Sequence, residues 1–268
     1  MGGNHLTYSC GEICGFIDTY APPEYKEEGD NIGLQLGGRE QGIDRLFLTL
    51  GLTHEVLQEA LDFDADMLVV HHSPFYYPYQ QLREEDLNTI VLTLIRQKVA
   101  LFAAHTNLDM AMGGVSDILA LRLGLKQITV LQPYSQQMET IGLGRIGILE
   151  EAISLEEFAR HVSKCLETEG VRFVGQKDQK IQTVACCGGS AAYLQTQALE
   201  KGADCYVTAD VKYHDGLIAW ETGLGLIDAG HYATESPVIP VLAAYLQDKM
   251  PDLTIQVSCS RAEPFHYL

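Results

Sequence analysis

Six residues with metal-binding side chains follow three short apolar runs of the sequence, at points where buried strands are expected to end. They are His71, His72, His105, Asp109, His231 and Glu235. Side chains at the carboxyl end of a parallel strand face the crevice where α/β proteins bind their ligands. Imidazole nitrogens and carboxylate oxygens suit iron, manganese or zinc better than soft-metal or iron–sulfur sites. The residue types and their placement therefore predict a site for divalent metal ions.

The number of donors is sufficient for two ions. A two-metal centre needs imidazoles on both ions and a bridging carboxylate, with the ions roughly 3.5–4 Å apart and sharing an activated water. His71 and His72 are adjacent, so their side chains leave the strand in different directions and can serve two ions, or one ion and its substrate. The structural alternative is a set of unrelated capping and core residues. Cys10 and Cys14 lack a second cysteine pair at zinc-site spacing, so we expect both to be packing residues.

The composition is that of a folded, acidic protein. The 268 residues include 36 Asp and Glu against 18 Lys and Arg, a formal net charge of −18, and 46% are hydrophobic. A phosphate-coated partner requires Lys and Arg, so neither nucleic acid nor a membrane is expected as a partner. No apolar run reaches the roughly 18 residues of a membrane span, and the first ten residues lack signal-peptide features. Seven cysteines, an odd number, fit reduced thiols, so we expect a cytoplasmic protein.

Strands and helices alternate along the sequence, which predicts an α/β fold with a mostly parallel sheet. The strands expected from apolar, β-branched runs are Leu46–Leu50, Met67–Val70 and Cys205–Thr208. The helix starts expected from capping signals are Thr53, Ser154 with Glu157, and Ser236 with Pro237. The helix after Ser154 is expected to stop at Gly170.

The two halves of the sequence are similar. Residues 60–66 align without gaps on residues 198–204, an offset of 138, and Gly51 falls on Gly189 at the same offset. We therefore predict two similar α/β domains from an internal duplication, with the metal site in the crevice between them. The boundary is expected near residues 127–137, where Pro133 and polar residues interrupt the pattern. The predicted domains are residues 1–127 plus 236–268 and residues 128–235.

Five motifs in this order extend over nearly the whole chain. They are Asp30-Asn31-Ile32-Gly33-Leu34, His71-His72, His105-Thr106-Asn107-Leu108-Asp109 with Gly113-Gly114, Cys187-Gly188-Gly189-Ser190, and Asp228-Ala229-Gly230-His231-Tyr232-Ala233-Thr234-Glu235. Together they closely resemble the YbgI (Nif-three-like) family. This family consists of hexameric proteins with a dinuclear metal centre, and its members are labelled GTP cyclohydrolase I type 2 homologues.

The resemblance implies a ligand set, a fold and an assembly. The implied metal ligands are His71, His72, Asp109, His231 and Glu235, with His105 beside the site. Two divalent ions per subunit are implied, of iron, zinc or manganese, together with two similar α/β domains and a homohexamer built as a trimer of dimers. The sequence departs from the family at Ala209, where relatives often have glycine, and alanine tolerates a positive φ less well.

These observations predict a dinuclear metal-dependent hydrolase. The family label implies a nucleotide or related heterocycle as substrate, with ring-opening hydrolysis of GTP as the nominal reaction. His105 and His214 are the candidate catalytic acid/base residues, while Asp210 and Lys212 are candidates to support a ligand or contact the substrate. Residues 188–190 form either a phosphate cradle or a tight turn of small residues. The alternative is a non-catalytic metal-binding protein for metal storage, delivery or sensing, which requires the same ligands.

Overall fold

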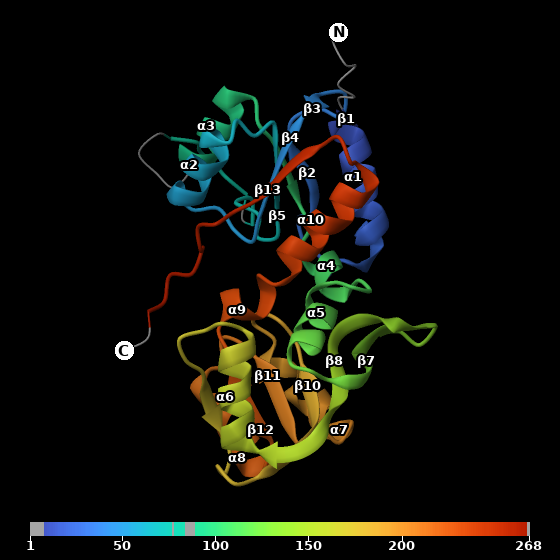
Figure 1. The fold of residues 1–268 in the computed structure, drawn as a ribbon, viewed down its shortest axis with the longest axis vertical. Coiled ribbons are helices and arrows are strands. Elements are labelled where there is room, and N and C mark those ends of the chain that lie inside the picture. Colours follow the sequence, from blue (N-terminus) through green and yellow to red (C-terminus); the bar gives the residue numbers. More distant parts are fainter. Residues whose placement is uncertain (1–7, 77, 84–88, 267–268) are drawn as a thin grey trace. The chain divides into compact units, whose positions relative to one another are not determined.

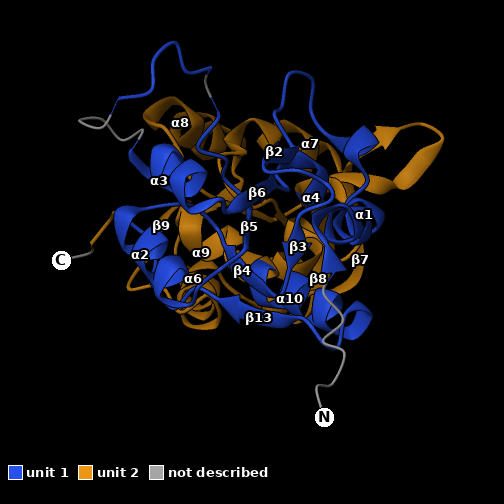
Figure 2. Cartoon of the chain, turned by 90° about the horizontal axis from the view of Figure 1, so that it is seen from above, with its two compact units in different colours: residues 1–108, 239–263 blue, residues 109–238, 264–268 orange. Residues whose placement is uncertain are grey.

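The computed structural model describes residues 8–76, 78–83 and 89–266 (Figure 1). The chain forms two compact units, which Figure 2 colours separately. Unit 1 comprises Met1–Leu108 and Ile239–Glu263, and unit 2 comprises Asp109–Val238 and Pro264–Leu268. The predicted domain limits stay a prediction, because compactness alone does not establish which segment folds independently.

Unit 1 contains a five-stranded mixed sheet. Its elements are β1 (Tyr8–Ser9), α1 (Cys10–Tyr20), a 3₁₀ turn (Pro23–Tyr25), β2 (Gly33–Leu36), β3 (Gly42–Ile43), β4 (Arg45–Thr49), α2 (His54–Asp62), β5 (Met67–Val70), α3 (Thr89–Gln97), β6 (Ala100–Ala103), the start of α4 (Thr106–Met110), α10 (Val238–Lys249) and β13 (Thr254–Val257). The chain passes into unit 2 within α4, at Asp109. The strand order is β13-β4-β5-β6-β2, with the first four strands parallel and β2 antiparallel to β6. β1 and β3 form a separate antiparallel ribbon.

The core of unit 1 explains its continuous apolar strands. Phe47, Leu68 and Leu101, from three neighbouring strands, are fully buried and pack with Val56 of α2 and Leu94 of α3. Each buried side chain of this size contributes about 1.5–3 kcal/mol by leaving water. The parallel strands are therefore held in place, and with them the residues that follow each strand.

Unit 2 contains a six-stranded mixed sheet. Its elements are α5 (Val115–Arg122), β7 (Lys126–Ser135), β8 (Met138–Ser154), α6 (Leu155–Cys165), β9 (Arg172–Val174), β10 (Lys180–Cys186), a 3₁₀ turn (Ala192–Leu194), α7 (Gln195–Glu200), β11 (Cys205–Thr208), α8 (Tyr213–Thr222), β12 (Gly225–Asp228) and α9 (His231–Glu235). The strand order is β7-β8-β10-β11-β12-β9; the neighbouring pairs β10–β11 and β11–β12 are parallel, and the other neighbouring pairs are antiparallel.

The sheet of unit 2 differs from the mostly parallel sheet that the sequence predicted. A tight turn joins β7 to β8, and two strands joined in this way pair antiparallel. In Figure 1 this hairpin extends beyond the rest of its sheet. Residues 127–137, where the domain boundary was expected, lie in β7 and the turn that follows it.

The predicted elements are confirmed where local signals define them. The three predicted strands are β4, β5 and β11, with β4 displaced by one residue. The Thr53 hydroxyl accepts a hydrogen bond from Val56 N at the start of α2. Both hydrogen bonds of the capping box between Ser154 and Glu157 are present at the start of α6. This helix ends at Cys165, earlier than the predicted stop at Gly170. A turn follows the helix directly, before the chain reaches Gly170.

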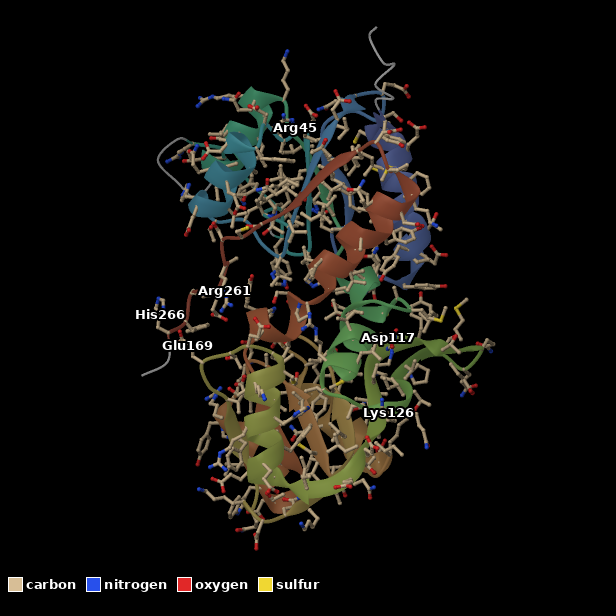
Figure 3. All side chains as sticks on the ribbon, viewed as in Figure 1. Arg45, Asp117, Lys126, Glu169, Arg261 and His266 are labelled. Atoms are coloured by element: carbon tan, nitrogen blue, oxygen red, sulfur yellow. The ribbon has the colours of Figure 1, made fainter. Side chains whose placement is uncertain are left out.

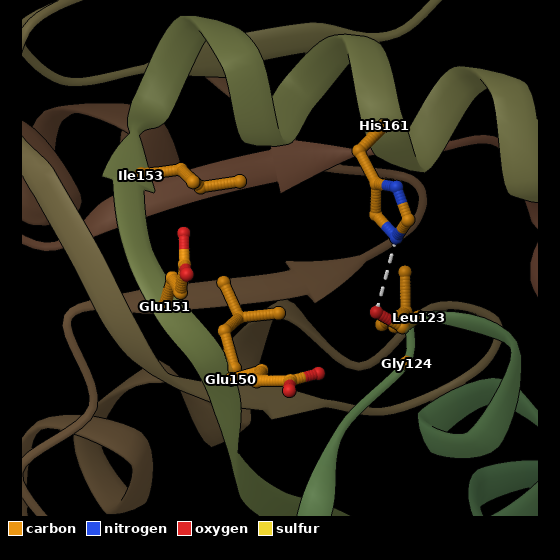
Figure 4. A pocket seen from close by; sticks show the side chains of 7 residues that line it. Leu123, Gly124, Glu150, Glu151, Ile153 and His161 are labelled. Carbon is orange, nitrogen blue, oxygen red and sulfur yellow. Dashed lines mark hydrogen bonds between the residues drawn. The ribbon is translucent and has the colours of Figure 1, made fainter.

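A cavity of about 360 Å³ lies in unit 2 between α6 and β8 (Figure 4). Its lining residues are Leu123, Gly124, Leu149, Glu150, Glu151, Ile153 and His161. His161 Nε2 hydrogen-bonds Leu123 O at 3.1 Å across it. None of the six predicted metal donors lines this cavity, so it does not mark the predicted site. Separately, every helix within the described ranges falls short of the length and apolar character that crossing a bilayer demands.

Candidate metal centre

Three histidines meet at the carboxyl edge of the unit 1 sheet. His71 and His72 follow β5, and His105 follows β6, the next parallel strand. One ring nitrogen from each of the three lies within 4.8 Å of the others, and the ring centroids are 4.8–5.6 Å apart. We call His71, His72 and His105 the unit 1 donor group. The residues that follow β5 and β6 therefore bring three imidazoles together at this edge.

The backbone fixes His71 before any ligand arrives. His71 N donates to Leu50 O at 3.1 Å, and His72 N donates to the same carbonyl at 2.7 Å. The His71 ring is fully buried, and its Nδ1 lies 2.8 Å from Ala104 O. Because a carbonyl only accepts hydrogen bonds, Nδ1 carries the proton and the lone pair is on Nε2. Metal-ligating histidines are typically oriented in this way.

A carboxylate orients His105. Both carboxylate oxygens of Asp30 lie 3.0 Å from His105 Nδ1. Asp30 also accepts hydrogen bonds from Thr106 N at 3.1 Å and Thr106 Oγ1 at 2.5 Å. Burial raises the pKa of Asp30, but the hydrogen bonds from His105 and Thr106 outweigh it and hold the pKa well below its usual range. Asp30 therefore stays ionised, and its contact with Nδ1 fixes the orientation of the His105 ring.

A second group of donors lies in unit 2. His231 begins α9 and Glu235 ends it one turn later, with His231 Nε2 3.0 Å from Glu235 Oε2. Carboxylate oxygens of Asp109 and Glu235 lie within 4.8 Å of each other. We call Asp109, His231 and Glu235 the unit 2 donor group. It has one imidazole and two carboxylates, whereas the unit 1 donor group has three imidazoles.

The charges of the unit 2 donor group shift the pKa values around it. Burial lowers the pKa of His231, but hydrogen bonds and charge from Glu235 and Asp210 outweigh it and raise the pKa to about 9. Burial, aided by the negative charges of Asp109 and Glu235, raises the pKa of the Cys187 thiol to about 12. The carboxylates around His231 thus favour positive charge at this position.

Asp210 supports His231 as Asp30 supports His105. Asp210 Oδ2 lies 2.7 Å from His231 Nδ1, which leaves Nε2 directed at Glu235. The positive φ in this turn is at Asp210, at 52°, and not at the preceding Ala209, so the departure from the family's glycine carries no strain at Ala209.

Small residues allow the chain to pass close to Glu235. Gly189 has a φ of 65°, and a Cβ at this position would lie 2.1 Å from Glu235 Oε1. A Cβ at Gly188 would lie 2.6 Å from Val115 Cγ1. Because the protein's own Glu235 carboxylate lies against this turn, where it would repel a phosphate, the structure favours the tight-turn interpretation of residues 188–190 over a phosphate cradle.

His214 belongs to neither donor group. It is exposed on α8, its ring contacts Tyr213, and it belongs to none of the three-donor groups found among the described residues. Its predicted catalytic role stays a prediction. Cys10 and Cys14 are buried on α1 with their sulfur atoms 4.0 Å apart, as expected of packing residues. Asp30 was recognised in the sequence only as part of a motif, and its contact with His105 spans 75 residues.

The donor groups fit divalent metal ions. The unit 1 donor group offers nitrogen donors and the unit 2 donor group offers nitrogen and oxygen donors. In His71, His105 and His231, Nδ1 is held by a carbonyl or carboxylate. Turn glycines make room for the Glu235 carboxylate, as the unit 2 geometry requires. The chemistry of the side chains is therefore consistent with a metal site built from His and Glu clusters.

Comparisons with known proteins identify the family. Residues 8–264 match the family described as Duf34/NIF3 (NGG1p interacting factor 3). A Streptococcus pneumoniae serotype 4 protein named GTP cyclohydrolase 1 type 2 homolog is 31% identical over 265 residues, covering 96% of this chain and 98% of the relative. The crystal structure of a Bacillus cereus protein related to NIF3 has a TM-score of 0.93 at 26% identity, covering 98% of this chain and 99% of that one.

A structure of protein ybgI has the same fold, with a TM-score of 0.81 at 24% identity, covering 93% of this chain and 97% of that one. The mixed α/β architecture of two mixed sheets is thus shared with solved structures, and the resemblance seen in the sequence is confirmed. The chain belongs to the Duf34/NIF3 family.

Proposed function

We propose that the protein binds two divalent metal ions per subunit, of iron, zinc or manganese, and uses them to hydrolyse a nucleotide or related heterocycle. The proposed ligands are His71, His72, Asp109, His231 and Glu235. The observation that carries the proposal is the unit 1 donor group, in which three imidazoles converge and two have Nδ1 held by fixed acceptors. Within unit 2, the carboxylates of Asp109 and Glu235 are of the ligand type that can bridge two ions.

The chain's own residues prepare the reaction. When bound, two divalent ions supply Lewis acidity and activate a water for attack. Asp30 orients His105 through Nδ1, so Nε2 would be the atom that takes a proton from a water, and the ionised Asp30 would stabilise the resulting imidazolium. Asp210 and Ala104 hold the rings of His231 and His71 in one orientation, which removes the cost of ordering them at the moment of reaction.

Substrate and assembly are parts of the same proposal. Relatives carry the name GTP cyclohydrolase 1 type 2 homolog, which supports a purine nucleotide or a related ring as the substrate to test first. We propose a homohexamer, a trimer of dimers, for the native protein. A monomeric mass by light scattering would remove the hexamer and leave the metal chemistry intact.

We also propose that the two units arose by internal duplication. Leu46 pairs in register with Met67 in unit 1, and Val184 pairs with Cys205 in unit 2, so both pairs are separated by the offset of 138 found in the sequence. This shared register supports a common origin for the central strands.

Metal analysis tests the proposed ligands. The purified protein is loaded with zinc, manganese or iron, desalted and analysed for metal, beside the double variant Asp109→Ala/Glu235→Ala. The matched control is Asp252→Ala/Glu221→Ala, which removes the same two charges from exposed positions. We expect two ions per subunit in the wild type and the control, and at least tenfold weaker binding in the double variant. Equal metal content in all three proteins would refute the ligand assignment.

Turnover of GTP and a panel of nucleotides by the metal-loaded protein tests the hydrolase. Product above the level of the double variant supports it. Full metal binding without turnover of any nucleotide would favour the metal-storage, delivery or sensing alternative.

A further inference from the structure

The C-terminal segment of unit 1 is fastened to α2 by one carboxylate. Glu59 accepts hydrogen bonds from Ser258 Oγ at 2.8 Å, Cys259 N at 2.8 Å and Ser260 N at 3.1 Å. Gln256 Nε2 donates to the same carboxylate at 3.2 Å. Burial raises the pKa of Glu59, but these hydrogen bonds outweigh it and lower the pKa from its usual value. We call residues 256–263 the C-terminal strap.

The strap leaves the sheet at the edge where the unit 1 donor group lies. β13 is parallel to β4, with Val257 paired to Leu48, and Ser258 N continues the pairing by donating to Leu48 O at 2.9 Å. The chain after β13 therefore emerges at the same edge as the residues that follow β5 and β6. A Cβ on Gly51 would lie 3.8 Å from His72 and 3.9 Å from Ala262, so Gly51 borders both the donor group and the strap.

The strap carries an exposed cation, Arg261, labelled in Figure 3. Among the described residues no carboxylate forms an ion pair with it, whereas Arg145 pairs with Asp117 and Arg172 pairs with Asp228. Glu55 of α2 also contacts the strap, accepting a hydrogen bond from Ser260 Oγ at 3.3 Å. The negative charge of Glu59 is already shared among four donors.

An anionic ligand needs such a group here. The chain has a net charge of −18, which repels anions at long range, so attraction must come from local cations. A guanidinium presents its N–H donors in a planar fork that matches two phosphate oxygens. Fastening the strap through Glu59 orders the backbone of Arg261 before binding, which reduces the entropy lost when the anion binds.

We propose that Arg261 binds a phosphate group of the substrate beside the unit 1 donor group. The assignment rests on the proposed function, because it identifies the substrate as a phosphate ester or phosphoanhydride. Arg261 acts on binding and specificity, and the histidines and their ions act on the bond that is hydrolysed. Glu59 is a positioning residue that acts through the strap.

The test measures binding of inorganic phosphate by calorimetry, with the full chain both metal-loaded and metal-free. Arg261→Gln removes the fork and its charge, and Arg122→Gln on the exposed face of α5 is the control with the same charge change. We expect Arg261→Gln to weaken phosphate binding about tenfold, Arg261→Lys less, and Arg122→Gln less than twofold. Wild-type phosphate affinity in Arg261→Gln, or no phosphate binding by the wild type, would overturn the assignment.

A double-variant cycle tests the role of the strap. Glu59→Gln leaves Arg261 in place but weakens its attachment, so we expect phosphate binding to fall about threefold. In Glu59→Gln/Arg261→Gln the affinity is expected to equal that of Arg261→Gln alone, because Glu59 acts only through Arg261. A further loss in the double variant would refute the positioning role of Glu59.

Metal content separates this proposal from the proposed function. Arg261→Gln is expected to bind as much metal as the wild type, because Arg261 is no ligand. Loss of metal in Asp109→Ala/Glu235→Ala with unchanged phosphate binding in Arg261→Gln would retain the metal centre and remove the phosphate site. Absence of metal from the wild type with weakened phosphate binding in Arg261→Gln would do the reverse.

Discussion

The two units build the same three parallel strands and finish their sheets differently. In unit 1, Asp66 accepts hydrogen bonds from the amides of residues 44 and 45, both at 2.9 Å. In unit 2, Asp204 accepts from the amides of residues 182 and 183, at 2.9 and 2.8 Å. Each aspartate precedes one strand and accepts hydrogen bonds from the neighbouring strand, so the same interaction stabilises the register of the central strands in both units.

A glutamine repeats the correspondence. Gln41 Nε2 donates to Asp66 O at 3.3 Å, and Gln179 Nε2 donates to Asp204 O at 3.3 Å. These contacts lie at the edge of each sheet opposite the donor groups, where the strands begin. Agreement at this edge shows that the scaffold is common to both units.

The units diverge at the other edge, where the strands end. The positions of His71 and His72 correspond, at the offset of 138, to Ala209 and Asp210. His72 belongs to the unit 1 donor group, whereas Asp210 orients the imidazole of His231. The strand that flanks the shared core also differs in direction, since β13 is parallel to β4 whereas β8 is antiparallel to β10. Corresponding positions at the ends of the strands therefore hold residues with different roles. The shared backbone determines where these side chains lie, and the residue type determines what each one does.

The largest effect on stability is expected at Gly189, whose surroundings differ from those of the corresponding Gly51. Gly189→Ala places a methyl group 2.1 Å from Glu235 Oε1 at a φ of 65°, so Glu235 must move. We expect a loss of about 2–3 kcal/mol in the free energy of unfolding, and weaker metal binding. The corresponding Gly51→Ala meets its nearest neighbour at 3.8 Å and is expected to change stability by less than about 0.5 kcal/mol. Urea unfolding of both variants, with metal analysis, makes the comparison; equal losses would contradict it.

A smaller effect on stability is expected from replacing Asp30 or Asp210, the carboxylates that orient His105 and His231. Asp30 has a folded-state pKa below that of the unfolded chain, so its stabilisation is present above the unfolded pKa and is lost as pH falls toward the folded value. We expect Asp30→Asn to lower the free energy of unfolding by about 1–2 kcal/mol at pH 7, and by less at pH 3. Asp210 is 43% exposed, so Asp210→Asn is expected to cost less stability while weakening metal binding. A constant deficit of Asp30→Asn across this pH range would contradict the assignment.

The sequence predicted those structural features that depend on residues a few positions apart in the chain. The capping box of Ser154 and Glu157 and the exit of His71 and His72 from a buried strand follow from spacings of a few positions. The partner of His105 was not predicted, because Asp30 is 75 positions away and no local pattern specifies such a contact. The antiparallel strands of unit 2 were missed for a related reason, since an apolar run indicates burial and not the direction of its neighbour.

The smallest effect tests whether the shared scaffold is equally important in both units. Asp66→Asn and Asp204→Asn each exchange a charged acceptor for a neutral amide at the same pair of backbone amides. Because the geometry is matched within 0.1 Å, the two variants are expected to lose the same free energy of unfolding, about 1 kcal/mol each. Equilibrium unfolding in urea, followed by circular dichroism, measures both losses. A loss confined to one variant would show that one unit unfolds before the other. The two units would then share the geometry of their central strands but differ in stability.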